Sequence, residues 1–396
     1  MQDEERQRTE PGRAQQAGEA ASGKEAQGGP EDPGRGFLLS LSRTVGVSGH
    51  EDRAAAAVEE GFTGLADEIR RDRLGNLVLV RRARRAGPEA AAEQAPATPR
   101  PPRIMLAAHM DEVGLVITQV DERGFLRFTA MGGVDQRILP AQMVRVHSRQ
   151  GDLPGVIGAK PPHIQTADEQ KRAIKMEDLF IDVGYDEAEA RRRVSVGDMA
   201  SIDMEPLSLR GQRLAGKSLD DRAGVAAMFV CLRELQHLQH SADVFAVATV
   251  QEEVSRLSGA ATCAFELQPD IGLVIDVGFG DMPGQPEDAG LKVGGGPAIG
   301  IGPHVHPKLF ARLKELAERW HIPYSLEPSP TPAGTDAYGI QITQAGVPTA
   351  LISLPLRYMH TPVELLDWRD VQAAGQLLAL FIASVDAAFV EGLRCF

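Results

Sequence analysis

Cysteine is scarce in this sequence, with only three residues, Cys231, Cys263 and Cys395, in a chain of 396. Such a sparse, odd-numbered set does not form the disulfide framework of a secreted domain and is typical of a reducing compartment. The spacing also excludes a zinc site built from cysteine thiolates. Because the N-terminus also lacks the apolar segment of a secretory signal, we expect a cytoplasmic protein.

Long hydrophobic runs and positive charge are also in short supply. No stretch approaches the roughly 18 apolar residues of a membrane helix, and 42 Lys and Arg against 55 Asp and Glu give a net charge of −13. We therefore expect no membrane span and no nucleic acid as a partner. The overall composition, with 43% hydrophobic and 24% charged residues, is ordinary for a globular protein. The length suggests about two domains and a tail.

The chain is expected to fall into three parts. Residues 1–36 contain no Val, Ile, Leu, Phe, Trp or Tyr, so they are predicted to be a disordered tail. Residues 37–113 and 207–396 alternate helical and strand patterns, which is typical of an α/β domain with a mostly parallel sheet flanked by helices. The predicted elements include a helix that begins at Phe37, a strand over 271–275 and a closing helix over 368–390. Short alternating runs make residues 114–206 a small inserted β-rich unit. Residues 81–103, rich in Arg, Ala, Glu and Pro, are predicted to form a loop.

Acidic and histidine residues gather in five motifs, most of them at predicted strand ends, where open α/β sheets place their sites. The motifs are Ala-His-Met-Asp-Glu-Val-Gly (108–114), Leu-Asp-Asp-Arg-Ala-Gly (219–224), Gln-Glu-Glu-Val (251–254), Asp-Val-Gly (276–278) and His-Thr-Pro-Val-Glu (360–364). One such Asp alone is more often a helix cap, and one His alone is more often a surface or core residue. Together they are the ligand mixture that Zn²⁺, Co²⁺ or Mn²⁺ prefers. The excess of carboxylates predicts two metals with one bridging carboxylate, because adjacent dications repel each other.

These motifs resemble the tetrahedral aminopeptidases, also called the glutamyl-aminopeptidase and deblocking-aminopeptidase family, which belong with other co-catalytic di-zinc exopeptidases. The resemblance runs from about Phe37 to about Val390, with the motifs in family order. It implies a metal-dependent aminopeptidase that acts on short peptides. It also implies that the inserted β-rich unit is a dimerisation domain and that dimers close into a twelve-subunit tetrahedral shell. Some members of the family have carried the label endoglucanase.

The resemblance also implies a ligand set, carried over motif by motif. His109 and Asp276 would bind one metal, Glu253 and His360 would bind the other, and Asp220 would bridge both. Two divalent ions per subunit are therefore expected, Zn²⁺ first, with Co²⁺ and Mn²⁺ as alternatives.

Further roles follow from the same resemblance. Glu252 would be the general base, close to the metal-bound water and free to take its proton. Asp111 would accept the imidazole N–H of His109 rather than bind metal. Asp221 would follow the bridging carboxylate across a cis peptide bond. The stretch 135–137 (Asp-Gln-Arg) would reach the active site of a neighbouring subunit.

Alternatives to this hypothesis are a glycoside hydrolase and a non-catalytic assembly subunit. A glycosidase needs two free carboxylates, for which Glu252 and Asp336 can be nominated, but aromatic residues are only 5% and just two are Trp. A non-catalytic subunit would have no use for an intact ligand set. An ordinary dimer is the alternative to the shell. One departure from the family, the turn Ser255–Ser258 in place of a glycine turn, bears on substrate preference, which the sequence does not predict.

Overall fold

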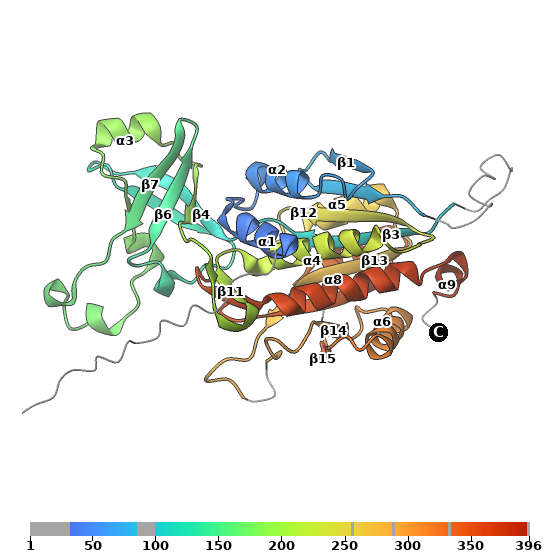
Figure 1. Cartoon of the computed structure of the whole chain (residues 1–396). Coiled ribbons are helices and arrows are strands. Elements are labelled where there is room, and N and C mark those ends of the chain that lie inside the picture. The colour runs from blue at the N-terminus through green and yellow to red at the C-terminus, as the bar shows by residue number, and fades with distance from the viewer. Residues whose placement is uncertain (1–31, 85–99, 255–256, 287–289, 332–333, 394–396) are drawn as a thin grey trace, which may run out of the picture. The chain divides into compact units, whose positions relative to one another are not determined.

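The computed structural model describes residues 32–84, 100–254, 257–286, 290–331 and 334–393. Its largest feature is an eight-stranded mixed sheet with the order β1-β2-β12-β3-β13-β16-β14-β15 (Figure 1). The central strands β12, β3, β13 and β16 are parallel, whereas β1–β2, β2–β12 and β14–β16 are antiparallel pairs. The strands are β1 (Glu68–Arg71), β2 (Leu77–Arg81), β3 (Arg103–His109), β12 (Asp243–Thr249), β13 (Ile271–Phe279), β14 (Ala298–Ile301), β15 (Ser325–Pro328) and β16 (Thr349–Leu356).

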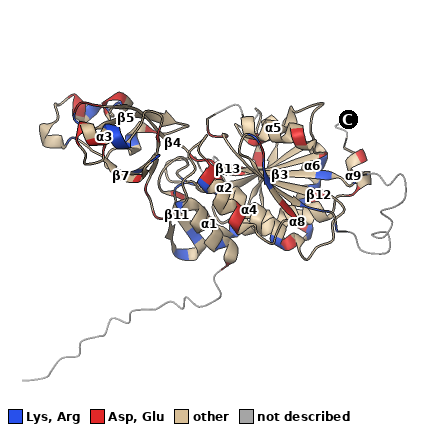
Figure 2. Cartoon of the chain, turned by 90° about the horizontal axis from the view of Figure 1, so that it is seen from above, with Lys and Arg blue, Asp and Glu red and all other residues tan. Residues whose placement is uncertain are grey.

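Helices cover both faces of this sheet, which explains why its central strands are continuous apolar runs. Helices α4 and α8 pack against each other on one face, and α5 and α7 pack together on the other; Figure 2 shows α4 and α5 on opposite sides of β3. The predicted α/β class is confirmed. The helices of this domain are α1 (Pro33–Arg43), α2 (Asp52–Gly61), α4 (Leu219–Leu235), α5 (Ser258–Leu267), α6 (Pro307–Arg319), α7 (Asp336–Gln341), α8 (Trp368–Ala383) and α9 (Ala387–Glu391).

The β-rich unit is a closed barrel with the strand order β4-β5-β8-β7-β6-β9. It has an apolar core of its own, separate from that of the large sheet. An ion pair between Arg53 of α2 and Asp152 of β7, 2.7 Å from Nη1 to Oδ2, joins it to the α/β domain. Its elements are β4 (Gly114–Val120), β5 (Leu126–Met131), β6 (Met143–Ser148), β7 (Gly151–Ile157), β8 (Ile181–Asp182), α3 (Glu187–Arg193) and β9 (Met199–Ile202).

A small antiparallel sheet follows the barrel in the chain. It has the strand order β10-β11-β17, formed by β10 (Leu207–Ser208), β11 (Arg213–Gly216) and β17 (Glu364–Asp367). Short 3-10 helices lie at Gln136–Ile138, Pro162–Ile164, Glu169–Lys171, Met176–Asp178 and Arg210–Gln212. In the part of the chain that the structure describes, we find no helix with the length and hydropathy of a membrane span.

Some predicted element boundaries are wrong. Strand β13 continues past Ile275 to Phe279, because its last residues stay paired with β16, where Phe279 lies opposite Leu356. Asp276 therefore lies inside a strand rather than at its end. The single closing helix predicted over 368–390 is instead α8 and α9, because Asp386 accepts a hydrogen bond from the backbone N–H of Phe389 (2.8 Å) and so starts a new helix.

The first helix also begins earlier than predicted, at Pro33 rather than at Phe37. Proline is favoured in the first helical turn because its missing N–H would find no partner there. Gly34 lies against the indole of Trp368, where an added Cβ would stand 2.9 Å from Cη2. The rest of the predicted tail, residues 1–31, lies outside the described residues, as do residues 85–99 of the predicted loop and Ser255 and Arg256 of the unusual turn.

Two truncations should distinguish the contribution of the tail to stability from that of helix α1. Deleting residues 1–31 removes a segment whose composition offers no packing surface, so melting temperature and turnover should not change. Deleting residues 1–36 also removes the first turn of α1 and its contact with Trp368, which should lower the melting temperature by roughly 2–4 °C for each kcal/mol lost. Differential scanning calorimetry on both proteins measures this. Equal melting temperatures for the two truncations would contradict it.

Candidate metal centre

The side chains predicted to bind metal come together near the carboxyl ends of the central strands of the large sheet. His109 is the last residue of β3, Asp276 lies in β13, and Asp220 stands at the start of α4. Glu253 follows the end of β12, and His360 lies between β16 and β17. Among the described residues, the ligand atoms of His109, Asp220 and Glu253 lie within 4.8 Å of one another, and so do those of His109, Asp221 and Asp276.

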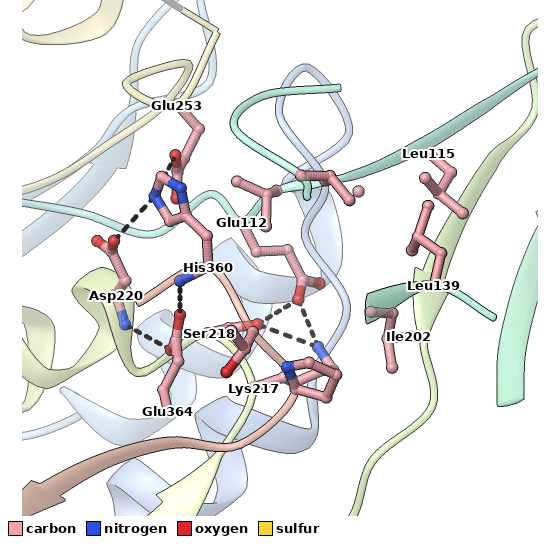
Figure 3. Close-up of a pocket in the computed structure, with 15 residues that line it drawn as sticks. Glu112, Leu115, Leu139, Ile202, Lys217, Ser218, Asp220, Glu253, His360 and Glu364 are labelled. Atoms are coloured by element: carbon pink, nitrogen blue, oxygen red, sulfur yellow. Dashed lines mark hydrogen bonds and ion pairs between the residues drawn. The ribbon is translucent and has the colours of Figure 1, made fainter. Parts of the chain in front are cut away.

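Asp220 lies between the two histidines. Its Oδ1 is 3.1 Å from Nε2 of His109, and its Oδ2 is 3.2 Å from Nε2 of His360. His360 Nε2 is also 3.2 Å from Oε2 of Glu253 (Figure 3). Each carboxylate oxygen of Asp220 therefore faces a different histidine, which is the arrangement that a bridging ligand requires.

Asp221 lies closer to the cluster than the sequence suggested. The peptide bond between Asp220 and Asp221 is cis, as the resemblance implies. The Asp221 carboxylate groups with His109 and Asp276. Its Oδ1 accepts a hydrogen bond from the backbone N–H of Gly224 (3.0 Å), whereas its buried Oδ2 has no hydrogen-bond partner in the described part of the chain.

Asp111 holds the two glutamates in place. Its carboxylate accepts hydrogen bonds from the backbone N–H groups of Glu252 (3.2 Å) and Glu253 (3.1 Å) and from the hydroxyl of Ser48 (2.5 Å). Its Oδ1 also lies 3.4 Å from Nδ1 of His109. Because β12 ends at Thr249, both glutamates lie in a turn where strand alternation no longer applies, so both side chains can face the cluster.

Glu364 is a site residue for which the sequence predicts no role. Its Oε2 accepts hydrogen bonds from the backbone N–H groups of Leu219 (2.6 Å) and Asp220 (3.1 Å). Its Oε1 accepts one from the N–H of His360 (2.9 Å; Figure 3). One buried carboxylate thus fixes the backbones that carry two predicted ligands. The only signal in the sequence was its place four residues after His360.

A second unpredicted feature is a buried group of charges behind the ligands. The Glu112 carboxylate lies 2.5 Å from Nζ of Lys217 and accepts a hydrogen bond from Ser218 (Figure 3). It also lies 3.6 Å from Nη2 of Arg222. Burial alone would raise the pKa of Glu112, but Lys217 and Arg222 overcome this effect and lower it from 4.5 to about 2. This group ties the segment after β3 to the start of α4.

Replacing Glu112 with glutamine should destabilise the fold, because it leaves two buried cations without their counter-charge. The expected loss is about 3–5 kcal/mol at neutral pH, the usual cost of breaking a buried pair. Since the folded pKa of Glu112 is lowered, its stabilising effect is complete above pH 4.5 and disappears as the pH falls toward 2. Denaturant titrations at pH 7 and pH 3 measure this. A difference between variant and wild type that does not shrink at pH 3 would contradict the assignment.

The electrostatics of the cluster fit divalent cations. Burial raises the pKa of Glu252 to about 10 and raises the pKa values of Asp276 and Glu253 as well. Hydrogen bonds to Asp220 and Glu253 raise the pKa of His360 to about 11. These buried carboxylates therefore hold protons tightly, because water does not reach them to stabilise their charge, and bound dications would supply that stabilisation instead. The donor set, imidazole and carboxylate, is the one that Zn²⁺, Co²⁺ and Mn²⁺ accept.

A cleft of about 920 Å³ opens beside the cluster, large enough for the first residues of a peptide. Asp220, Glu252, Glu253, Asp276 and His360 all line it. The same side chains that could hold metal are therefore accessible to a substrate.

Comparisons with known proteins point to one peptidase family. The family model for the M42 glutamyl aminopeptidases matches residues 92–377. A lysyl aminopeptidase of Pyrococcus furiosus is 36% identical over 85% of this chain and 92% of its own length. The TET1 peptidase of Pyrococcus horikoshii, whose structures show a tetrahedron or a large octahedral shell, is 28% identical with a TM-score of 0.75, over 89% of this chain and all of its own.

A further match bears the other label expected of this family. An endoglucanase of Thermotoga maritima is 29% identical with a TM-score of 0.70, over 90% of this chain and 99% of its own. Proteins with this fold are thus named both aminopeptidase and endoglucanase. The match to the family model, rather than either name, identifies the family of this chain. The chain belongs to the M42 glutamyl aminopeptidase family.

Proposed function

We propose that this chain is an aminopeptidase that works with two divalent metal ions. One would be held by His109 and Asp276 and the other by Glu253 and His360, with Asp220 shared between them. The observation that carries the proposal is the position of Asp220, with one oxygen 3.1 Å from His109 and the other 3.2 Å from His360. Asp221, whose Oδ2 is buried without a partner among the described residues, is an additional candidate ligand.

The mechanism assigns the proton transfers to Glu252. When bound, the metals would lower the pKa of a coordinated water toward about 7 and polarise the scissile carbonyl. Glu252 accepts the proton of the attacking water and returns it to the leaving amine. Asp111 is a positioning residue, since it holds the backbone N–H groups of both glutamates.

When bound, one of the metals could also hold the free α-amine of the substrate through its nitrogen lone pair. An acetylated N-terminus offers no such lone pair. This supports cleavage at the N-terminus rather than within a chain. The names of the relatives do not agree on the first residue, since one indicates a glutamyl and another a lysyl substrate.

The glycosidase alternative has less support. Its second carboxylate would be Asp336, which is 1% exposed and accepts a hydrogen bond from the Thr249 hydroxyl (2.5 Å). A general acid must reach the glycosidic oxygen of its substrate, and this carboxylate faces the protein interior instead.

We also propose that the barrel mediates assembly into homo-oligomers. Apolar side chains at its surface, Met143, Val156, Ile164 and Val196, are between 47% and 69% exposed. Such side chains are expected where another copy covers them. The 135–137 stretch stays the proposed contact with a neighbour's active site. Light scattering on the purified protein gives the mass, with twelve subunits expected and a monomer as the contradicting result.

The activity is tested with metal-stripped protein and a panel of aminoacyl-p-nitroanilides. Activity should be absent after chelation and should return on adding Zn²⁺, Co²⁺ or Mn²⁺. An N-acetylated substrate should not be cleaved. A two-carboxylate glycosidase would be unaffected by chelation, and a non-catalytic subunit would cleave nothing with any metal.

A further inference from the structure

We infer that the cleft selects a basic first residue, lysine or arginine, and that Glu327 of β15 is the residue that recognises it. The inference rests on the proposed aminopeptidase function and adds the substrate class. Three observations support the inference. They are the position of the Glu327 carboxylate in the cleft, its lack of a cationic partner among the described residues, and the apolar side chains that line the cleft around it.

Glu327 reaches the same face of the sheet as the proposed ligand Asp276. Its Oε2 accepts a hydrogen bond from the hydroxyl of Ser353 (2.5 Å), and Ser353 is the register partner of Asp276 on the neighbouring strand. Its Oε1 lies 3.1 Å from the position that a Cβ on Gly278 would take. Residues 276 and 278 point to the same side of β13, since side chains alternate along a strand. The absence of a side chain at Gly278 thus leaves room for Leu291, whose Cδ1 would lie 2.6 Å from such a Cβ, and for the Glu327 carboxylate beside it.

The separation from the metal site suits a long side chain. Two residues along a strand span about 7 Å, so the Glu327 carboxylate, which contacts Ser353 and the position of residue 278, lies up to roughly that far along β13 from Asp276. A substrate whose α-amine is held at the metal site would extend its first side chain over this distance. The extended stem of lysine or arginine covers it, whereas a short side chain does not.

The charge of the cleft favours a cation. Apart from the proposed ligands and base, Glu327 is the one charged side chain among the described residues that line it, and none of these is Lys or Arg. Glu327 is partly buried, and no described Lys or Arg lies within ion-pair distance of its carboxylate. Burial raises the pKa of Glu327, with only the Ser353 hydroxyl opposing the effect. An incoming ammonium or guanidinium would supply the missing counter-charge.

The remaining lining suits the methylene stem of such a side chain. Leu257, Phe279, Ile342 and Met359 all border the cleft. Basic side chains commonly lay their stems along apolar surface while the charged end finds a polar partner. A glutamyl side chain would instead meet Glu327 as a like charge.

The experiment compares kcat/KM for Lys-, Arg-, Leu- and Glu-p-nitroanilide on the metal-loaded enzyme. The wild type should prefer Lys and Arg. Glu327→Gln, which keeps the hydrogen bond with Ser353, should lower kcat/KM for Lys by about 10- to 100-fold, the range for losing a charged hydrogen bond, and leave Leu nearly unchanged. Glu327→Lys should move the preference toward Glu. Glu315→Gln, an exposed glutamate on α6, is the matched control and should change no ratio.

Other outcomes overturn the inference. An equal fall for Lys and Leu would make Glu327 a structural link between β15 and β16. A wild type that cleaves Leu or Glu in preference to Lys would also be decisive against it, while leaving the aminopeptidase function intact. Failure of the proposed function itself would appear as no cleavage of any of the four substrates. Calorimetric binding of lysinamide and leucinamide gives a second readout without turnover, and equal affinities for the two would likewise contradict the inference.

Discussion

Asp220→Asn is expected to release both metal ions and to lower turnover by about a thousandfold or more. The carboxylate has one oxygen beside each of the two histidines, and a neutral amide cannot screen the repulsion between two dications. Lewis-acid stabilisation is worth several kcal/mol, and each 1.36 kcal/mol is tenfold in rate, so losing the metals accounts for this factor. Elemental analysis of the purified variant and single-turnover kinetics measure the two effects.

The control for Asp220→Asn is another buried aspartate. Asp370 of α8 is 1% exposed and accepts hydrogen bonds from the N–H groups of Gly294 (2.7 Å) and Gly296 (2.8 Å), away from the cluster. Asp370→Asn should lose stability but keep its metals. Two ions per chain in Asp220→Asn, at wild-type affinity, would rule out the bridging role.

Glu252→Gln and Glu253→Gln should fail in different ways, although the two residues are adjacent. Glu252→Gln removes proton acceptance and keeps the shape, so metal content and substrate affinity should stay normal. Turnover should fall by roughly 10²- to 10⁴-fold, the usual contribution of a positioned general base. Glu253→Gln removes an anionic ligand beside His360, so it should weaken one metal site, and excess metal should partly restore activity.

Metal titration and steady-state kinetics on both variants test this contrast. Each variant serves as the control for the other, because both keep the backbone N–H groups that bind Asp111. A metal-deficient Glu252→Gln together with a metal-replete, inactive Glu253→Gln would reverse the two roles.

The sequence indicated the cluster because its members lie in short motifs beside strongly apolar strands. His109 directly ends β3, and Glu253 follows β12 by a few residues, so their place at one edge of the sheet follows from local pattern alone. The apolar run predicts a strand that ends at Asp276, whereas the pairing of β13 with β16 continues to Phe279. The ends of β13 depend on a partner strand that lies far away in the sequence.

The supporting residues could not be predicted in the same way. Glu112 contacts Lys217 across 105 positions of the chain, and the Glu364 carboxylate contacts the Asp220 N–H across 144. Such contacts depend on how the domain packs, and a buried glutamate has no periodic pattern to distinguish it from an exposed one. Glu327 is a similar case, since β15 is a short edge strand whose place in the cleft is set by its neighbours in the sheet.

Activity measured against added metal tests the central claim most directly. Metal-stripped protein is titrated with Zn²⁺, Co²⁺ or Mn²⁺ while hydrolysis of an aminoacyl-p-nitroanilide and bound metal are followed together. The account predicts no activity without metal and a plateau at two bound ions per chain, lost again on chelation. Full activity in the stripped protein, or a plateau at a single bound ion, would contradict it.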